Sequence, residues 1–451
     1  MTASKQPVDQ ARLAAYRTLR AVSADDAYAN LVLPRQLTAA GISGRDAALA
    51  TELAYGSLRA RGVLDEVLGR CSSRPLADIE PAVLDLLRLG AYQLLKTRVP
   101  THAAVATTVD LARASGNARA TGFVNAVLRK VSAHDFDGWC DRIGAGATGL
   151  GQLALRYSHP GWIVGAFAEA LGNSADAELE DALAADDTRP EIHLVAWPGL
   201  IDAAELAGQA GGEPGRYSPY AVRLTSGGEP AGLPAIRDGL AGVQDEGSQL
   251  CALALTRLPV AGPDERWLDL CAGPGGKAAL LAALATDRGA RLTANERHPH
   301  RAELVARATE RWPVEVLTGD AQRLDGSYDR VLLDAPCTGL GALRRRPEAR
   351  WRRGPADLAD LMALQADLLD AAVRLTRPGG VLAYVTCSPH LAETTGQVER
   401  ALLRHPQLEL LDARPAFAGV DQLADQPTVQ LWPHRHGTDA MFFAGLRVRE
   451  G

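Results

Sequence analysis

From about Val243 onward the sequence alternates between short apolar segments and longer amphipathic ones, and this alternation limits the fold more than any other feature. Buried strands are predicted at residues 266–270, 291–295, 314–318, 328–333 and 381–386. Helices are predicted at residues 278–285, around Leu304, at 357–375 and at 394–403. Strands that alternate with helices are typical of a doubly wound sheet. The sequence therefore predicts a Rossmann-like α/β domain over residues 241–449.

A glycine-rich turn, Cys271–Lys277, connects the first of these strands to its helix. Its glycines allow a sharp turn and a close approach of the backbone to a ligand: Gly273, Gly275 and Gly276. A phosphate-binding P-loop is excluded, because Ala278 follows Lys277 where Ser or Thr is required. A dinucleotide such as NAD and S-adenosylmethionine both remain compatible with the turn.

Two acidic residues follow the next two strands. Glu296 ends the second predicted strand, where a carboxylate binds ribose hydroxyls. Asp320 ends the third, where it could accept a hydrogen bond from an adenine amine. Each alone could equally be a solvated loop carboxylate. Their common register with the glycine turn favours a nucleotide-type ligand.

Two cysteines also follow predicted strands, Cys337 after Asp334-Ala335-Pro336 and Cys387 after Thr386. Ligands bind at the carboxyl ends of strands in open α/β sheets, so two thiols there predict one nucleophile and one helper in a covalent mechanism. Thiolate is the reactive form, and a cation such as Lys277 or an arginine would favour it. The remaining cysteines are expected to be inert small hydrophobes: Cys71, Cys140, Cys251 and Cys271.

The chain before this domain divides into three parts. Residues 6–133 carry apolar residues at helical spacing and are predicted to form an all-α bundle. Residues 134–152 include a glycine-rich stretch and are predicted to be a linker. Residues 153–240 are predicted to form a small α+β module that binds RNA, with helices beginning near residues 160 and 174 and a strand at residues 191–197.

Composition excludes several classes of protein. The net charge of −6 argues against a uniformly basic coat, although a local basic patch is enough to bind nucleic acid. The six cysteines form no CxxC pair, so no metal site is expected. Met1–Lys5 is not typical of a signal peptide, and no apolar stretch is long enough to span a bilayer. We expect a cytoplasmic protein with reduced thiols.

Three segments of the α/β domain resemble the motifs of the RNA (cytosine-5)-methyltransferases: Cys271–Lys277, Asp334–Cys337 and Thr386–Ser388. Residues 244–249 resemble the segment that precedes the cofactor strand in that family. Three segments of the N-terminal part resemble a NusB domain, namely residues 46–56, 89–95 and 122–129. The combination is similar to bacterial 16S ribosomal RNA (cytosine-C5)-methyltransferases, and the resemblance covers nearly the whole chain.

The resemblance implies a monomeric enzyme that transfers a methyl group from S-adenosylmethionine to C5 of a cytosine in RNA. The expected substrate is 16S ribosomal RNA, with tRNA or 23S ribosomal RNA as alternatives. Cys387 would be the nucleophile, Cys337 would assist release of the product, and Asp334 would pair with the amino edge of cytosine. The residues expected to line the cofactor site are Cys271, Ala272, Gly273, Pro274, Gly275, Gly276, Lys277, Glu296, Asp320 and Asp334.

The sequence also departs from the pattern of that family at a few positions. Gly273 replaces a common alanine, which is expected to be harmless in a turn, and Ala278 replaces a common threonine. Ala440 stands where glycine is usual. Residues 194–197 lack the usual Arg-Val-Asn, which puts RNA contacts of the small module in doubt.

An arginine-rich segment, residues 344–353, follows Cys337 after a short loop. Arginines beside a catalytic strand end suit contacts with RNA phosphates, and an aromatic ring can stack on a base. The predicted RNA-binding residues are Arg345, Arg346, Arg350 and Trp351. A solvated helix face is the alternative.

Two other functions are compatible with parts of the sequence. A NAD-dependent oxidoreductase would use the glycine turn but gives residues 334–337 no role. A non-enzymatic RNA-binding module would rest on the NusB-like part alone and would not require Cys387.

Overall fold

The computed structural model describes residues 8–225 and 230–450, which form two compact units. The first unit contains the described residues up to Gly165, together with Asp176–Arg189 and Leu343–Arg352. The second contains Ala166–Ala175, Pro190–Ala342 and the described residues from Arg353 onward. Met1–Lys5, the start of the predicted bundle at residues 6 and 7, and residues 226–229 of the predicted small module lie outside the described residues.

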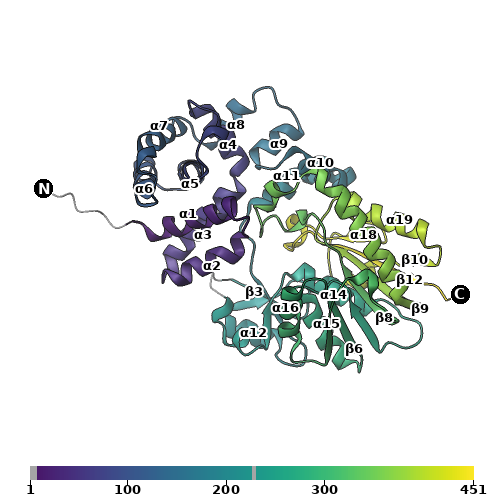
Figure 1. Ribbon diagram of the computed structural model, residues 1–451. Coiled ribbons are helices and arrows are strands. Elements are labelled where there is room, and N and C mark those ends of the chain that lie inside the picture. The colour runs from purple at the N-terminus through teal and green to yellow at the C-terminus, as the bar shows by residue number, and fades with distance from the viewer. Residues whose placement is uncertain (1–7, 226–229, 451) are drawn as a thin grey trace. The chain divides into compact units, whose positions relative to one another are not determined.

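The first unit is helical, as the sequence predicts (Figure 1). Its N-terminal helices are α1 (Gln10–Ala24), α2 (Ala29–Ala39), α3 (Gly44–Arg59), α4 (Arg61–Cys71), α5 (Pro81–Lys96), α6 (Thr101–Ala114) and α7 (Thr121–Val131). The Asp9 carboxylate caps α1 by accepting a hydrogen bond from the Arg12 N–H, and Pro81 begins α5 where no N–H partner is needed. Their apolar faces meet in one core that includes Leu53, Leu64 and Leu86.

The segment predicted as a linker, residues 134–152, is largely structured. It contains α8 (Phe136–Ile143) and the start of α9 (Leu150–Arg156). Trp139 and Cys140 of α8 are buried in the core of the first unit, and the Trp139 indole N–H donates to the Val131 carbonyl at 2.8 Å. This segment therefore packs on the bundle, because its aromatic and apolar residues lie on one face of a short helix.

The α+β module is smaller than predicted. Residues 153–189 are helical, with α10 (Gly161–Leu171) and α11 (Ala175–Asp187) beginning close to the predicted positions. The module itself contains β1 (His193–Ala196), α12 (Ala203–Ala210), β2 (Gly212–Pro214), β3 (Ala221–Leu224), α13 (Pro234–Arg237) and β4 (Ala241–Val243). The antiparallel sheet has the order β2-β3-β1-β4. This is the split β-α-β arrangement, which a single predicted strand did not reveal.

The predicted Rossmann-like domain is confirmed. Its parallel strands are β5 (Arg266–Asp269), β6 (Arg291–Glu296), β7 (Val314–Thr318), β8 (Tyr328–Asp334) and β9 (Thr376–Thr386). The sequence did not reveal three C-terminal strands, β10 (Leu408–Leu410), β11 (Val429–Gln430) and β12 (Phe442–Val448). The sheet order is β10-β12-β9-β8-β5-β6-β7, with β12 antiparallel to β9 and paired also with β11.

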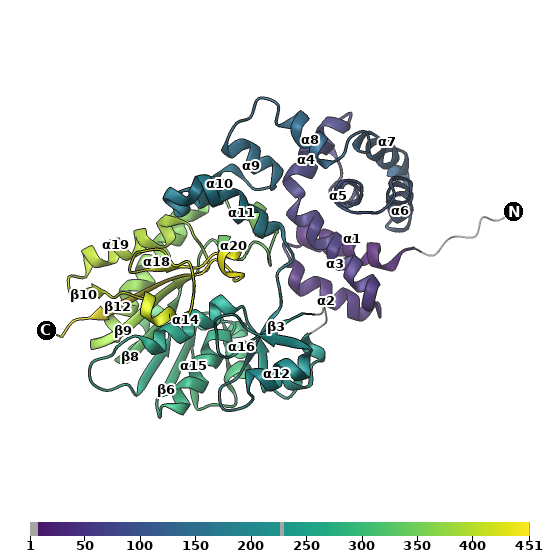
Figure 2. The same ribbon diagram turned by 180° about the vertical axis from the view of Figure 1, so that it is seen from behind.

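Helices cover both faces of this sheet (Figures 1 and 2). Leu332 of β8 faces the cluster made with α14 (Glu246–Arg257), α15 (Gly276–Asp287) and α16 (Pro299–Thr309). Its neighbours Val331 and Leu333 face the opposite cluster, with α18 (Pro355–Leu375) and α19 (Thr395–Arg404). The continuous apolar run of β8 thus follows from burial on both faces.

No helix in the described part of the chain is long and apolar enough to cross a membrane.

Candidate active site

The functional side chains of the second unit come from neighbouring strand ends. Strands β5 and β8 pair in parallel with Asp269 opposite Leu332, and β8 and β9 pair with Asp334 opposite Val385. The carboxyl ends of these parallel strands therefore meet at one edge of the sheet. At this edge lie the glycine-rich turn Cys271–Lys277 after β5 (the cofactor turn), Cys337 after β8 and Cys387 after β9.

The two predicted thiols are brought together. The Sγ atoms of Cys337 and Cys387 lie 3.4 Å apart, and both side chains are half-buried. The backbone reinforces this pairing, because the Gly341 N–H donates to the Cys387 carbonyl at 2.9 Å. The hydrogen bond to Cys387, followed by burial, raises the pKa of the Cys337 thiol. Cys337 therefore holds its proton more tightly than an ordinary cysteine.

Lys277 and Asp334 form an ion pair at the same edge, with 2.8 Å between Nζ and Oδ2. Burial by itself would lower the pKa of Lys277, but the charge of Asp334, with smaller effects of Cys251 and Cys387, raises it overall. Lys277 is thus an ammonium group, and its positive charge interacts with Cys387. This position fits the predicted role of a cation that favours the thiolate.

The cofactor turn has the close packing that its glycines permit. Gly275 has a φ of +111°, and a Cβ atom there would lie 2.7 Å from the Cβ atom of Ala308. Gly273 donates its N–H to the Glu296 carboxylate at 3.1 Å, and a Cβ atom on Gly273 would lie 2.1 Å from the same carboxylate. Glycine at 273 is therefore compatible with the turn, and its missing side chain leaves the space that Glu296 uses.

The two predicted acidic residues differ in their surroundings. Glu296 is buried and also accepts a hydrogen bond from the His298 N–H at 2.9 Å, with the Arg301 guanidinium at 3.6 Å. Asp320 is half-buried and caps the short helical turn that follows β7 by accepting from the Gln322 N–H at 3.1 Å. Both stand at strand ends on the edge of the sheet that carries the glycine turn, as the sequence predicts.

Sequence reasoning missed one acidic residue of this edge, Asp269 at the end of β5. Its side chain is buried, and neither carboxylate oxygen has a hydrogen-bond partner among the described residues. Burial and then the charge of Asp334 raise the pKa of Asp269 to about 7, with smaller opposing effects of Lys277 and the Cys271 backbone. Its place directly before the turn was the available signal. An unpartnered buried carboxyl is suited to receive a cationic ligand group.

The arginine-rich segment has a role that the sequence did not predict. Arg350 is fully buried in the first unit, where its guanidinium bonds Asp187 at 2.8 Å, the Asp186 carbonyl at 2.9 Å and the Arg59 carbonyl at 3.2 Å. A guanidinium with these buried partners is not available to a phosphate. The structure therefore contradicts an RNA contact for Arg350, and its physical role is to anchor the segment to the helices.

The other three residues of the predicted RNA patch are more accessible. Trp351 is half-buried, and its indole N–H points to the Leu58 carbonyl at 3.4 Å, so its ring packs within the first unit. Arg345 is half-buried, whereas Arg346 is exposed, with its guanidinium 5.7 Å from the centre of the Tyr28 ring. Arg346 is thus the most accessible of the four predicted contacts.

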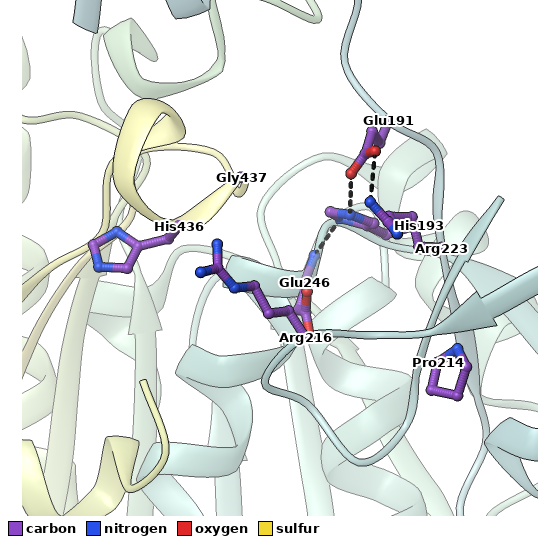
Figure 3. Close-up of a pocket in the computed structure, with 8 residues that line it drawn as sticks. All are labelled: Glu191, His193, Pro214, Arg216, Arg223, Glu246, His436 and Gly437. Carbon is purple, nitrogen blue, oxygen red and sulfur yellow. Dashed lines mark hydrogen bonds and ion pairs between the residues drawn. The ribbon is translucent and has the colours of Figure 1, made fainter. Parts of the chain in front are cut away.

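A cavity of about 420 Å³ opens elsewhere in the second unit (Figure 3). Its charged residues are mostly paired: Arg223 bonds Glu191 at 3.0 Å, and the His193 Nδ1 atom accepts from the Glu246 N–H at 3.2 Å. The lining contains neither thiol and no residue of the cofactor turn. This cavity is therefore separate from the strand-end site. Within the described residues, no group of three or more His, Cys, Asp or Glu side chains could hold a metal ion.

Two family models match the chain, 16S rRNA methyltransferase RsmB/F over residues 258–447 and NusB over residues 9–133. Rv1407 of Mycobacterium tuberculosis, provisionally named a methyltransferase, is 58% identical over 98% of this chain and 97% of its own length. The chain belongs to the RsmB/F methyltransferase family. Another relative, ribosomal RNA small subunit methyltransferase B of Salmonella newport, is 33% identical over 96% of this chain and 97% of its own.

Solved structures support the fold. The crystal structure of PH0851 has a TM-score of 0.82 at 22% identity and covers 98% of this chain and 99% of that chain. A methyltransferase homologue from Pyrococcus horikoshii has a TM-score of 0.53 at 23% identity, over 66% of this chain and 98% of that one. The predicted resemblance to 16S ribosomal RNA methyltransferases, the NusB domain and the Rossmann-like fold are confirmed.

Membership of the RsmB/F family makes the protein a methyltransferase, and the predicted methyl donor, S-adenosylmethionine, is confirmed at the level of the family. The residues present fit this donor, because the glycine turn, Glu296 and the unpartnered Asp269 lie at the ends of the neighbouring strands β5 and β6. An NAD-dependent oxidoreductase and a non-enzymatic NusB-type module are both at odds with this family.

Proposed function

We propose that this RsmB/F methyltransferase transfers the methyl group of S-adenosylmethionine to C5 of a cytosine in 16S ribosomal RNA, through a transient bond between Cys387 and C6 of the base. The observation that carries the proposal is the 3.4 Å approach of the Cys337 and Cys387 sulfurs at neighbouring strand ends. Methylation of a ring nitrogen or amino group needs no pair of thiols, whereas attack on a pyrimidine ring followed by elimination can use both.

The cofactor would lie across the carboxyl ends of β5, β6 and β7. Backbone groups of Cys271–Lys277 would approach it closely, Glu296 would accept from the ribose hydroxyls and Asp320 from the adenine amine. Asp269 would receive the ammonium group of the methionine part, because its buried carboxyl has no other partner in the described chain. The bound cofactor supplies an electrophilic methyl group on a sulfonium centre.

The chain's own residues divide the remaining work. The thiolate of Cys387, stabilised by the ammonium group of Lys277, bonds to C6 and thereby raises the electron density at C5. Asp334 accepts a hydrogen bond from the amino group of cytosine and holds the ring in the site. After C5 has accepted the methyl group, a base in the site removes the C5 proton, and Cys337 assists the release of the product. The electrons of the C5–H bond then re-form the ring double bond, and the Cys387–C6 bond breaks.

Ribosomal RNA is the proposed substrate because a relative that matches nearly the whole chain is named a ribosomal RNA small subunit methyltransferase. Arg345 and Arg346, on the segment that follows Cys337 in sequence, are the proposed phosphate contacts. A cytosine in paired RNA would have to leave its stack to reach the thiols, so a loop or an incompletely assembled ribosomal subunit is favoured over a stable helix.

The test is methylation of purified 16S, 23S and transfer RNA with the full-length protein and S-adenosylmethionine, followed by bisulfite sequencing. We expect one protected cytosine in 16S ribosomal RNA and none with Cys387→Ala. A protected cytosine in 23S or transfer RNA would change the substrate but keep the chemistry. A methyl group on a nitrogen atom or on another base would overturn the proposed reaction.

A further inference from the structure

Glu393, in the turn that precedes α19, is a fully buried carboxylate beside both thiols. Its Oε1 atom accepts from the Thr338 N–H at 2.8 Å and from the Gln365 side-chain amide at 3.1 Å. Its Oε2 atom accepts from the hydroxyl groups of Thr338 at 2.5 Å and Ser388 at 2.7 Å. Thr338 follows Cys337 directly, and Ser388 follows Cys387 directly. One side chain therefore binds the residue after each thiol.

Burial of the Glu393 carboxylate lowers the stability of the fold unless its oxygens accept hydrogen bonds. A buried carboxylate without a cation is expensive, and no ion pair joins Glu393 to any described residue. Four hydrogen bonds compensate its charge, and three of them come from the two cysteine loops. Gln365 extends the network, since its side-chain amide also donates to the Pro336 carbonyl at 2.9 Å. The loop before and after Cys337 is thus fixed from the same centre.

We propose that Glu393 is a positioning residue of the reaction. Its carboxylate links Thr338 to Ser388 and thereby fixes the distance between the Cys337 and Cys387 sulfurs. It also keeps the proton of the hydrogen bond between these two sulfurs on Cys337. This inference rests on the proposed function, because it concerns the division of roles between the two thiols. Glu393 touches neither the base nor the cofactor in this role. It acts through the loops that carry the sulfurs.

The charges around Cys337 agree with the proposal. The hydrogen bond to Cys387 and burial are the larger causes that raise the pKa of Cys337, and the charge of Glu393 acts in the same direction. Tyr384 of β9 also interacts with Cys337, and burial followed by the charges of Cys337 and Glu393 raises the pKa of Tyr384. With the proton held on Cys337, Cys387 is left as the nucleophile.

Two substitutions separate geometry from charge. Glu393→Gln keeps an oxygen for Thr338 N–H and Gln365 and offers an amide for the two hydroxyl groups, so it keeps the loops tied but removes the charge. Glu393→Ala removes both the hydrogen bonds to the two loops and the negative charge. Glu399→Gln is the matched control, because Glu399 lies exposed on the neighbouring α19. Thermal unfolding of each variant identifies any loss of fold.

The readouts are kcat and KM for RNA, the fraction of RNA-linked protein at steady state, and the pH at which iodoacetamide alkylates each cysteine, followed by mass spectrometry. For Glu393→Gln we expect alkylation of Cys337 at lower pH and a kcat several-fold lower, with KM within twofold of the wild type. For Glu393→Ala we expect a kcat at least tenfold lower and accumulation of RNA-linked protein. Glu399→Gln should match the wild type throughout.

Two outcomes would overturn the inference. One is wild-type kcat and wild-type cysteine titration in Glu393→Gln. The other is a Glu393→Ala protein whose melting temperature falls while kcat per folded molecule and the RNA-linked fraction stay unchanged. Cys387→Ala in the same assay distinguishes a failure of this inference from a failure of the proposed covalent reaction. If Cys387→Ala is inactive and both Glu393 variants match the wild type, only this inference fails. If Cys387→Ala still methylates RNA, the proposed covalent reaction itself fails.

Discussion

Lys277 and Asp334, 57 residues apart in the sequence, form a largely buried ion pair at the strand edge that carries both thiols. Lys277 comes from the cofactor turn and Asp334 from the end of β8. The pair therefore joins the element that would bind the methyl donor to the element that would hold the base. The field of Lys277 also reaches Cys387.

Lys277→Gln removes the ammonium group and leaves Asp334 unpaired. Because a nearby cation favours a thiolate, we expect Cys387 to be alkylated by iodoacetamide only at higher pH. Methyl transfer should fall roughly 10-fold or more, as expected when a group that stabilises charge at the reacting centre is lost. Arg307→Gln, at a side chain that is 73% exposed on α16, is the control. Equal reactivity of Cys387 in Lys277→Gln and wild type would remove Lys277 from the mechanism.

Asp269 makes stability depend on pH in a defined direction. Its pKa of about 7 in the folded protein lies above the ordinary value near 4, so the folded state binds more protons between those two values. The free energy of unfolding should therefore fall as pH rises from about 4 to about 7, by about 4 kcal/mol at most, and level off above. Asp269→Asn should lack this contribution. Urea unfolding of both proteins at several pH values measures it, and identical slopes would contradict the assignment.

Gly275→Ala tests the cofactor turn. An alanine there would need a φ of +111° and would place its Cβ atom 2.7 Å from Ala308, which we expect to cost about 2 kcal/mol or more and to weaken S-adenosylmethionine binding. Gly276→Ala is the matched control for packing, since its Cβ atom would approach only Gln244, at 3.7 Å or more. Calorimetric titration with the cofactor and thermal unfolding compare the two. Equal stability of both variants would show that the turn is not tightly packed.

The arginine-rich segment should give two different mutant phenotypes. Arg345→Ala together with Arg346→Ala should weaken RNA binding and make its dependence on salt shallower. Arg350→Ala should instead lower the free energy of unfolding by about 3–5 kcal/mol, because it leaves Asp187 without its buried partner. Filter binding at several salt concentrations and urea unfolding distinguish them. An unchanged salt slope in the double variant would remove the patch from the RNA interface.

The elements that position the site could be predicted from the sequence because their patterns are local. Short apolar segments of five or six residues predicted β5 to β9. The turns that follow β5, β8 and β9 contain glycines or a cysteine, residue types that indicate ligand binding or nucleophilic chemistry. The pairing of Cys337 with Cys387 also follows, since adjacent parallel strands end at the same edge of the sheet.

What could not be predicted depends on contacts between distant parts of the chain. The burial of Arg350 depends on carbonyl groups of Arg59 and Asp186, which no local pattern connects to residue 350. The position of Glu393 between the two cysteine loops depends on the fold of the turn before α19. Asp269 was missed because an aspartate that ends a strand looks the same whether or not it finds a partner.

The transient bond between Cys387 and the cytosine ring is tested most directly by the fate of the RNA in the Cys337→Ala variant. This variant should attack and methylate the base but fail to eliminate Cys387, so denaturing gels should show an RNA-linked protein, with mass spectrometry placing a methylated cytidine on Cys387. Cys387→Ala should bind the cofactor normally and form no such species. A nucleotide attached to residue 337, or complete methylation of RNA by Cys387→Ala, would contradict the account.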